Sequence, residues 1–207
     1  MATETIPPVT LPAAPLAPPA PPAPPVEAGT RYRFTAADIE RMVEVGILTE
    51  SDRVELIDGE VLVMSAVGRK HVRCVYQLNW LLSRQLSDEY RVSLQSPLLL
   101  NDDTEPEPDV VVIRYHDEIA LPSPTDTMLV MEVSDSSLAY DRATKLPRYA
   151  IAGIPEVWII DLTTNTLERH TEPSNGEYRR TDRVRAGETI ASAVLPTLNL
   201  PVDTVLG

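Results

Sequence analysis

The sequence has very little cysteine and no long apolar run. Cys74 is the single cysteine in 207 residues, which excludes an internal disulfide and indicates a reducing compartment. No apolar stretch approaches the roughly 20 residues that a membrane-spanning helix needs. Lys and Arg are absent before Arg31, whereas a secretory signal begins with positive charge. We therefore expect a cytoplasmic protein without a membrane segment.

Positive charge is also scarce. The chain has 18 Lys and Arg against 31 Asp and Glu, and its net charge is −13. The overall field therefore opposes non-specific binding to nucleic acid, although a bound magnesium ion would reverse the sign of the charge locally. The sequence has no serine elbow, phosphate-binding loop or zinc-ligand spacing. This argues against triad hydrolases, nucleoside triphosphatases and zinc proteins.

Proline, in contrast, is abundant and unevenly placed. Half of the 20 prolines lie in residues 1–29, which we predict to be a disordered proline-rich tail with polyproline-II character. Such a tail is either a solvated spacer or a segment that contacts a protein with a proline-binding groove. Residues 30–207 are then long enough for one domain with its own core.

In this domain, hydrophobic periodicity predicts both helices and strands. Thr35-Ala36-Ala37-Asp38 is typical of a capping box, and Asp58-Gly59 and Asn175-Gly176 are typical of hairpin turns. We predict helices over 35–45, 69–87 and 140–152, strands over 90–100, 109–114, 128–134 and 156–162, and short extended pieces over the last twenty residues. Pro147 would lie in a first turn or kink its helix. The fold class is therefore α/β with a mixed sheet and added hairpins.

Two carboxylates interrupt the apolar strands. Asp109 begins one strand and Glu132 lies near the end of the next, where a buried charge is costly unless it has a partner. If these strands are neighbours, both carboxylates could converge on a hard cation such as magnesium, which takes oxygen ligands. Alternatively, Asp109 accepts backbone N–H bonds where its strand begins. Glu132 has fewer structural explanations.

The order of several motifs resembles a known family. Pro108-Asp109, Glu132-Val133-Ser134 and Lys145 follow one another as in the PD-(D/E)XK nuclease superfamily. Within it, the chain resembles the Uma-type family of restriction-endonuclease-like proteins of bacteria over residues 31–206. The segments that carry this narrower resemblance are 54–60, 105–109, 130–134, 140–150 and 153–161.

The resemblance implies a restriction-endonuclease-like core with the order helix, strand, strand, strand, helix, strand. It also implies a metal-dependent endonuclease that hydrolyses phosphodiester bonds of DNA. Asp109 and Glu132, with Val133, would be ligands of Mg²⁺, for which Mn²⁺ could substitute, and Lys145 would position or activate the attacking water. Chemically, a cation neutralises developing charge and lowers the pKa of a water, and an ammonium acts as a point charge beside it.

One position departs from the superfamily pattern. A lysine is expected two residues after the second acid, and Ser134 occupies that place. Lys145 can substitute only if its helix directs the side chain back to the same site. Otherwise Lys145 is a solvent-facing helix residue.

Further residues have two interpretations each. Glu55 completes the acidic cluster as a catalytic residue or pairs with a cation such as Arg53. His71 is a base or phosphate contact, or it caps its helix, and Asp141 orients Lys145 or acts as a cap. A competing hypothesis for the whole chain is a catalytically inactive nuclease fold that serves as a binding or assembly module. A homodimer would suit cleavage of both strands of a duplex.

Overall fold

The computed structural model describes residues 29–49, 51–116 and 122–206. Its contacts divide the chain into two units, Met1–Arg31 and Tyr32–Gly207, and the second unit contains all the elements described below. The proline-rich tail predicted over 1–29 lies, except for Gly29, outside the described residues. Within the described residues, no helix combines the length and apolar character needed to cross a membrane.

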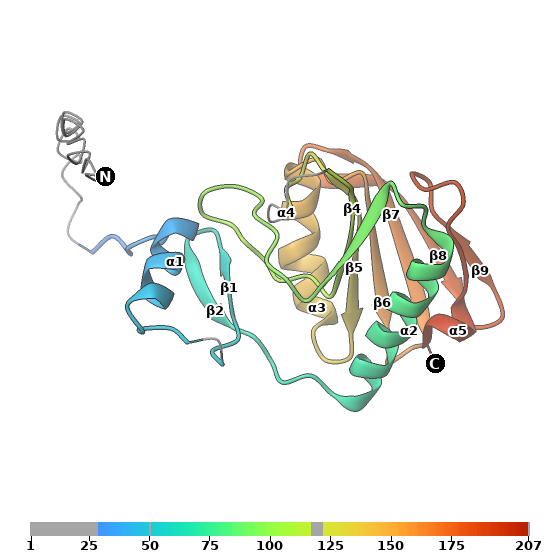
Figure 1. Cartoon of the computed structure of the whole chain (residues 1–207), viewed down its shortest axis with the longest axis horizontal. Helices are drawn as coiled ribbons and strands as arrows, with labels where there is room; N and C mark the ends of the chain where they lie inside the picture. Colours follow the sequence, from blue (N-terminus) through green and yellow to red (C-terminus); the bar gives the residue numbers. More distant parts are fainter. Residues whose placement is uncertain (1–28, 50, 117–121, 207) are drawn as a thin grey trace, which may run out of the picture. The chain divides into compact units, whose positions relative to one another are not determined.

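A six-stranded mixed sheet forms the centre of the second unit (Figure 1). All neighbouring strands are antiparallel except β5 and β6, which are parallel. The order across the sheet is β3 (Tyr90–Leu94), β4 (Val110–Arg114), β5 (Thr127–Ser134), β6 (Glu156–Asp161), β7 (Thr166–Ser174) and β8 (Glu177–Arg185). The predicted α/β class with a mixed sheet is confirmed. The first strand ends earlier than predicted because Gln95, with φ of 45°, leaves the extended conformation.

Helices cover both faces of this sheet. The connection from β5 to β6 is a helical crossover, as parallel strands require. It consists of α3 (Leu138–Tyr140), the π-helix η1 (Asp141–Lys145) and α4 (Leu146–Ile151), and it encloses a core around Tyr149 and Ile159. Helix α2 (Arg69–Gln85) packs on the opposite face, where Leu78 and Leu82 join the larger core. The predicted core order of helix, three strands, helix and strand is therefore present.

The hairpin of β1 (Val54–Ile57) and β2 (Glu60–Val63) lies outside the main sheet. Asp58 and Gly59 form its turn with positive φ angles of 49° and 75°, as two-residue hairpin turns demand. Leu56 pairs with Glu105, so the hairpin is attached to the loop that precedes β4. Helix α1 (Ala36–Glu44) begins with the predicted capping box at Thr35.

The C-terminal region differs in part from its prediction. Strands β9 (Thr189–Ala191) and β10 (Asn199–Pro201) are short extended pieces, as predicted, but α5 (Val202–Leu206) is a helix. Val202 and Val205, three residues apart, are fully buried there, and α5 contacts α2. This tertiary packing stabilises a helical turn for which the sequence has no periodic pattern of its own.

Candidate active site

A cavity of about 430 Å³ opens beside the ends of β4 and β5. It is lined by parts of the β1–β2 hairpin, the start of α2, both strands and the π-helix. Six carboxylates line it against two permanent cations, Arg53 and Lys145. This excess of negative charge makes the cavity suited to a cation. The carboxylates belong to Glu55, Glu107, Asp109, Glu132, Asp135 and Asp141.

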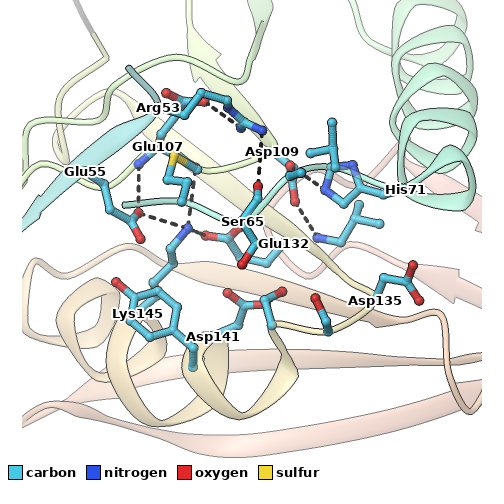
Figure 2. Close-up of a pocket in the computed structure, with 18 of the residues that line it drawn as sticks. Arg53, Glu55, Ser65, His71, Glu107, Asp109, Glu132, Asp135, Asp141 and Lys145 are labelled. Atoms are coloured by element: carbon cyan, nitrogen blue, oxygen red, sulfur yellow. Dashed lines mark hydrogen bonds and ion pairs between the residues drawn. The ribbon is translucent and has the colours of Figure 1, made fainter. Parts of the chain in front are cut away.

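Lys145 lies at the centre of the cavity, with its ammonium between Glu55 and Glu132 (Figure 2). Its Nζ is 3.2 Å from Oε2 of Glu55 and 3.4 Å from Oε1 of Glu132, and it donates to the carbonyl oxygen of Glu107 at 3.4 Å. The residue is buried. Burial alone would lower the pKa of Lys145, but the carboxylates of Glu132 and Glu55 outweigh it and raise the pKa above its usual range. The ammonium therefore stays charged.

The π-helix explains how Lys145 reaches this position. In η1, the N–H of Leu146 donates to the carbonyl oxygen of Asp141, five residues back. Pro147 follows in the first turn of α4; it has no N–H to donate, and in an α-helix its ring would clash with the carbonyl four residues back. The wider π-turn relieves this clash, and both of its end residues, Asp141 and Lys145, are buried. Such turns are frequent at functional sites.

Glu132 is the more deeply buried of the two carboxylates predicted to bind the metal. Its side chain is 3% exposed, and Oε1 accepts a 2.6 Å hydrogen bond from the hydroxyl of Tyr149. Burial raises the pKa of Glu132 to about 8, even though the Lys145 charge acts in the opposite direction. This carboxyl is therefore less easily ionised than a free glutamate, and a positive charge in the cavity favours its carboxylate form.

Asp109 approaches the cavity from the start of β4 and has two partners. Its Oδ2 accepts the backbone N–H of Val133 at 2.8 Å, and its Oδ1 lies 2.8 Å from Nε2 of His71. The backbone bond realises the alternative that the sequence left open, and it also anchors Asp109 next to Glu132. His71 does not cap α2, because the cap residue is Gly68 and it has no side-chain bond.

The β1–β2 hairpin supplies Glu55. This side chain is buried, and its Oε2 accepts the backbone N–H of Glu107 at 3.4 Å in addition to the Lys145 contact. Arg53, the alternative partner considered for Glu55, instead lies 3.3 Å from Oε1 of Glu107. The structure thus brings Glu55, Glu132 and Lys145 together, although Glu55 and Lys145 are far apart in the sequence.

Asp141 and Ser134 form a hydrogen-bonded pair near Lys145. The hydroxyls of Ser134 and Ser137 both donate to Oδ2 of Asp141 at 2.7 Å. Burial raises the pKa of Asp141, while these two hydrogen bonds act against the shift. Ser134, which stands where the superfamily pattern has lysine, therefore binds the π-helix that carries Lys145. Asp141 adds negative charge near Lys145 but makes no ion pair with it.

The donors in the cavity fit a magnesium ion chemically. Asp109 and Glu132 offer hard carboxylate oxygens from adjacent strands, and Val133 can contribute only its backbone carbonyl. Among the residues that the structure describes, no three His, Cys, Asp or Glu side chains meet in a metal-binding arrangement. Magnesium is commonly held by one or two carboxylates, with waters and substrate phosphates as the remaining ligands. A two-carboxylate site of that kind agrees with this donor set.

Two contributors to the site have no signal in the sequence. Tyr149 lies seventeen residues from Glu132, and its hydroxyl reaches that carboxylate only because the crossover folds α4 back against β5. Glu107 contributes its backbone carbonyl to Lys145, which no pattern of side chains can indicate.

His71 was among the sequence candidates, but its contact with Asp109 depends on how α2 packs. Its Nδ1 is buried and has no hydrogen-bond partner in the described part of the chain.

Comparisons with known proteins agree with this architecture. A family model described as Uma2, putative restriction endonuclease, matches residues 36–203. The crystal structure of a putative nuclease belonging to DUF820 from Anabaena variabilis is similar, with a TM-score of 0.63 and 16% sequence identity. The match covers 79% of this chain and 95% of that one, and at this identity it shows the fold alone. No curated protein sequence matches the chain.

Proposed function

Since this chain belongs to the Uma2 family of restriction-endonuclease-like proteins, we propose that it hydrolyses phosphodiester bonds of DNA in a reaction that depends on Mg²⁺. Family and fold together support a nuclease-like function. The metal and the substrate are the parts that this proposal adds. The observation that carries it is the convergence of Glu55, Glu132 and Lys145 from three separate elements on one cavity, beside Asp109.

Asp109, Glu132 and the carbonyl of Val133 would hold the cation, and Mn²⁺ could substitute for it. When bound, this ion supplies charge neutralisation for the phosphate and a water of lowered pKa. Glu132 would bind the cation as its carboxylate, the form that a second positive charge beside Lys145 would favour. The hydroxyl of Tyr149 keeps the carboxylate of Glu132 in place, and His71 fixes one oxygen of Asp109.

Lys145 has the chemistry of a water- or phosphate-positioning group. Its ammonium is a compact point charge, and Glu55 and the carbonyl of Glu107 hold it in the cavity. Glu55 therefore acts through Lys145 as a positioning residue. A persistently charged ammonium next to the attacked phosphate stabilises the charge that develops in the transition state.

The test is cleavage of single-stranded, duplex and branched DNA, and of RNA, in Mg²⁺ or Mn²⁺. We expect the wild type to cut DNA and Asp109→Asn, Glu132→Gln and Lys145→Met to lower the rate by about a hundred- to a thousand-fold each. Glu177→Gln is the matched control, because Glu177 is an exposed strand glutamate outside the cavity. Its rate should equal that of the wild type.

Calorimetry with Mn²⁺ completes this experiment. Asp109→Asn and Glu132→Gln should lose the binding signal, whereas Lys145→Met and Glu177→Gln should keep it. A wild type that cuts no nucleic acid and binds no Mn²⁺ would overturn the proposal and favour the binding or assembly module. Cleavage of RNA with no cleavage of DNA would overturn the choice of substrate.

A further inference from the structure

One side of α2 carries a line of basic and aromatic residues. Its members follow one another at spacings of four, three, four and four residues, which aligns them along a single side of the helix. The opposite side is buried in the larger core. We call the exposed line the α2 stripe; it consists of Arg69, Arg73, Tyr76, Trp80 and Arg84.

The aromatic members of the α2 stripe are largely exposed. Tyr76 is 70% and Trp80 is 52% exposed, whereas Trp158, the other tryptophan, is completely buried. Exposed apolar groups that gather on one face beside polar residues are typical of binding sites for ligands or partners. The guanidinium of Arg84 lies over the Trp80 ring, 5.0 Å from its centroid. Such a pair resembles the cationic and aromatic surfaces on which nucleobases stack.

The charge of α2 is opposite to that of the chain as a whole. The helix contains Lys70 and three arginines but no Asp or Glu, although the chain carries a net charge of −13. Across residues 29–49, 51–116 and 122–206, no ion pair involves Lys70 or an arginine of the α2 stripe. Two of the four arginines of β8 differ, since Arg180 pairs with Asp182 and Arg183 with Glu168. Free cations beside exposed rings are complementary to a polyanion that carries bases.

The α2 stripe is also continuous with the candidate active site. A hollow of about 350 Å³ beside it is lined by Val67, Arg69, Val72, Arg73, Tyr76 and Gln77. Val67 lines the active-site cavity too, and the first turn of α2 directs His71 to Asp109. A strand on this surface would therefore run directly toward the cavity.

We propose that the α2 stripe binds an unstacked strand of nucleic acid and guides it into the cavity; this inference rests on the proposed function for the identity of the polymer. Tyr76 and Trp80 stack on bases, and the arginines contact phosphates. Along the helix axis the two rings are about 6 Å apart, which exceeds the rise of about 3.4 Å between stacked bases. Successive bases reach both rings only when they are separated. The substrate class is therefore DNA with a single-stranded portion.

A second copy of this chain is a poorer occupant of the same surface. A two-fold interface through α2 would place each arginine row opposite the identical row of its partner. Like charges facing each other across an interface disfavour association. A polyanion has no such penalty, and each phosphate contact releases counterions.

The test measures binding of a labelled oligothymidine of about 20 nucleotides by fluorescence anisotropy in EDTA, so that hydrolysis plays no part. We expect Tyr76→Ala and Trp80→Ala each to weaken binding about tenfold or more, and Trp80→Phe to retain most of it. Arg73→Ala should weaken binding and lower the salt slope by about 0.7. The wild-type tryptophan emission should change on binding, and the Trp80→Phe variant should lack this change, because Trp158 is enclosed.

Tyr115→Ala is the matched control, because Tyr115 is also exposed and has Arg91 at 3.9 Å over its ring, outside α2. An equal loss of affinity in this control would overturn the inference, as would tighter binding of duplex than of oligothymidine. A dimer that dissociates in Trp80→Ala while oligothymidine binding is unchanged would assign the surface to a protein partner instead. Glu177→Gln should bind like the wild type. Binding without any cleavage would refute the proposed function alone.

Discussion

Two buried glutamates on neighbouring strands have very different surroundings. Glu132 on β5 and Glu156 on β6 are 2% and 0% exposed. Four donors satisfy Glu156: the indole N–H of Trp158 at 2.6 Å, the hydroxyl of Ser192 at 2.7 Å, and the backbone N–H groups of Ala193 and Val194 at 2.8 and 3.1 Å. Glu132 has the hydroxyl of Tyr149 and a longer contact with Lys145, and it lines a cavity.

The number of hydrogen-bond donors around each glutamate distinguishes a structural buried carboxylate from a functional one. Both glutamates belong to apolar strands, Glu132 near the end of β5 and Glu156 at the start of β6, so apolar patterning alone does not distinguish their roles. Glu156 is completely surrounded by donors that tie the C-terminal region to the sheet, and no ligand can approach it. Glu132 is desolvated but incompletely satisfied, which is the condition that raises its pKa and leaves it suited to a cation.

The largest effect on stability should come from Glu156→Ala. This change leaves the indole N–H, the Ser192 hydroxyl and two backbone N–H groups without their acceptor in a closed interior. We expect a loss of about 3 kcal/mol or more in the free energy of unfolding, measured by urea denaturation. Glu177→Gln, on an exposed strand position, should change it by less than about 0.5 kcal/mol. A stable Glu156→Ala protein would refute the structural role.

A smaller and pH-dependent effect is expected for Glu132→Gln. The folded-state pKa of Glu132, about 8, lies above its ordinary value of 4.5, so between these values the folded protein binds more protons than the unfolded chain. This group's contribution to stability therefore falls as pH rises through that window. The glutamine variant lacks this contribution. Its free energy of unfolding relative to the wild type should increase between pH 5.5 and 8.5.

Urea denaturation at several pH values, without divalent cations, measures this difference. The Glu177→Gln control should follow the wild type at each pH. Parallel curves for Glu132→Gln and the wild type would mean that Glu132 titrates as an ordinary surface carboxyl. Glu132 would then not be the incompletely satisfied buried carboxylate that the comparison with Glu156 requires.

Much of the fold could be predicted because its signals are local. Turn residues such as Asp58-Gly59 and Asn175-Gly176 fix hairpins within a few positions, and the spacing of apolar residues defines α2. The order of motifs then identified the family and its core. The helix at Val202–Leu206 was missed because α2 stabilises it across the domain.

The residues of the candidate site could also be predicted only in part. Asp109, Glu132, Lys145 and Glu55 were predicted from motif order, and the structure places all four at one cavity. Their catalytic and metal-binding roles stay predictions. The partners that set their chemistry could not be predicted, since the Tyr149 hydroxyl and the backbone of Glu107 meet them only after folding. The widening at Asp141–Lys145 was indicated only as a disturbance near Pro147.

The smallest effect on stability is expected when the hydrogen bond from Tyr149 to Glu132 is removed. Tyr149→Phe removes the hydroxyl that donates to Glu132, and Tyr178→Phe is its matched control, because the Tyr178 hydroxyl donates to the carbonyl oxygen of Ile154 at 2.8 Å. Each variant deletes one hydrogen bond, which is buried at Tyr149 and partly buried at Tyr178, and each should cost about 1 kcal/mol in the free energy of unfolding.

Only Tyr149→Phe should also change the titration of Glu132. The Tyr149 hydrogen bond lowers the pKa of that carboxyl, so its loss should raise the pKa further from its ordinary value. Since a cation needs the deprotonated carboxylate, the rise of Mn²⁺ affinity with pH should shift to more alkaline pH in Tyr149→Phe. Calorimetry across this pH range checks the shift. An equal shift in Tyr178→Phe would show that a general loosening of the fold, rather than the bond to Glu132, controls the site.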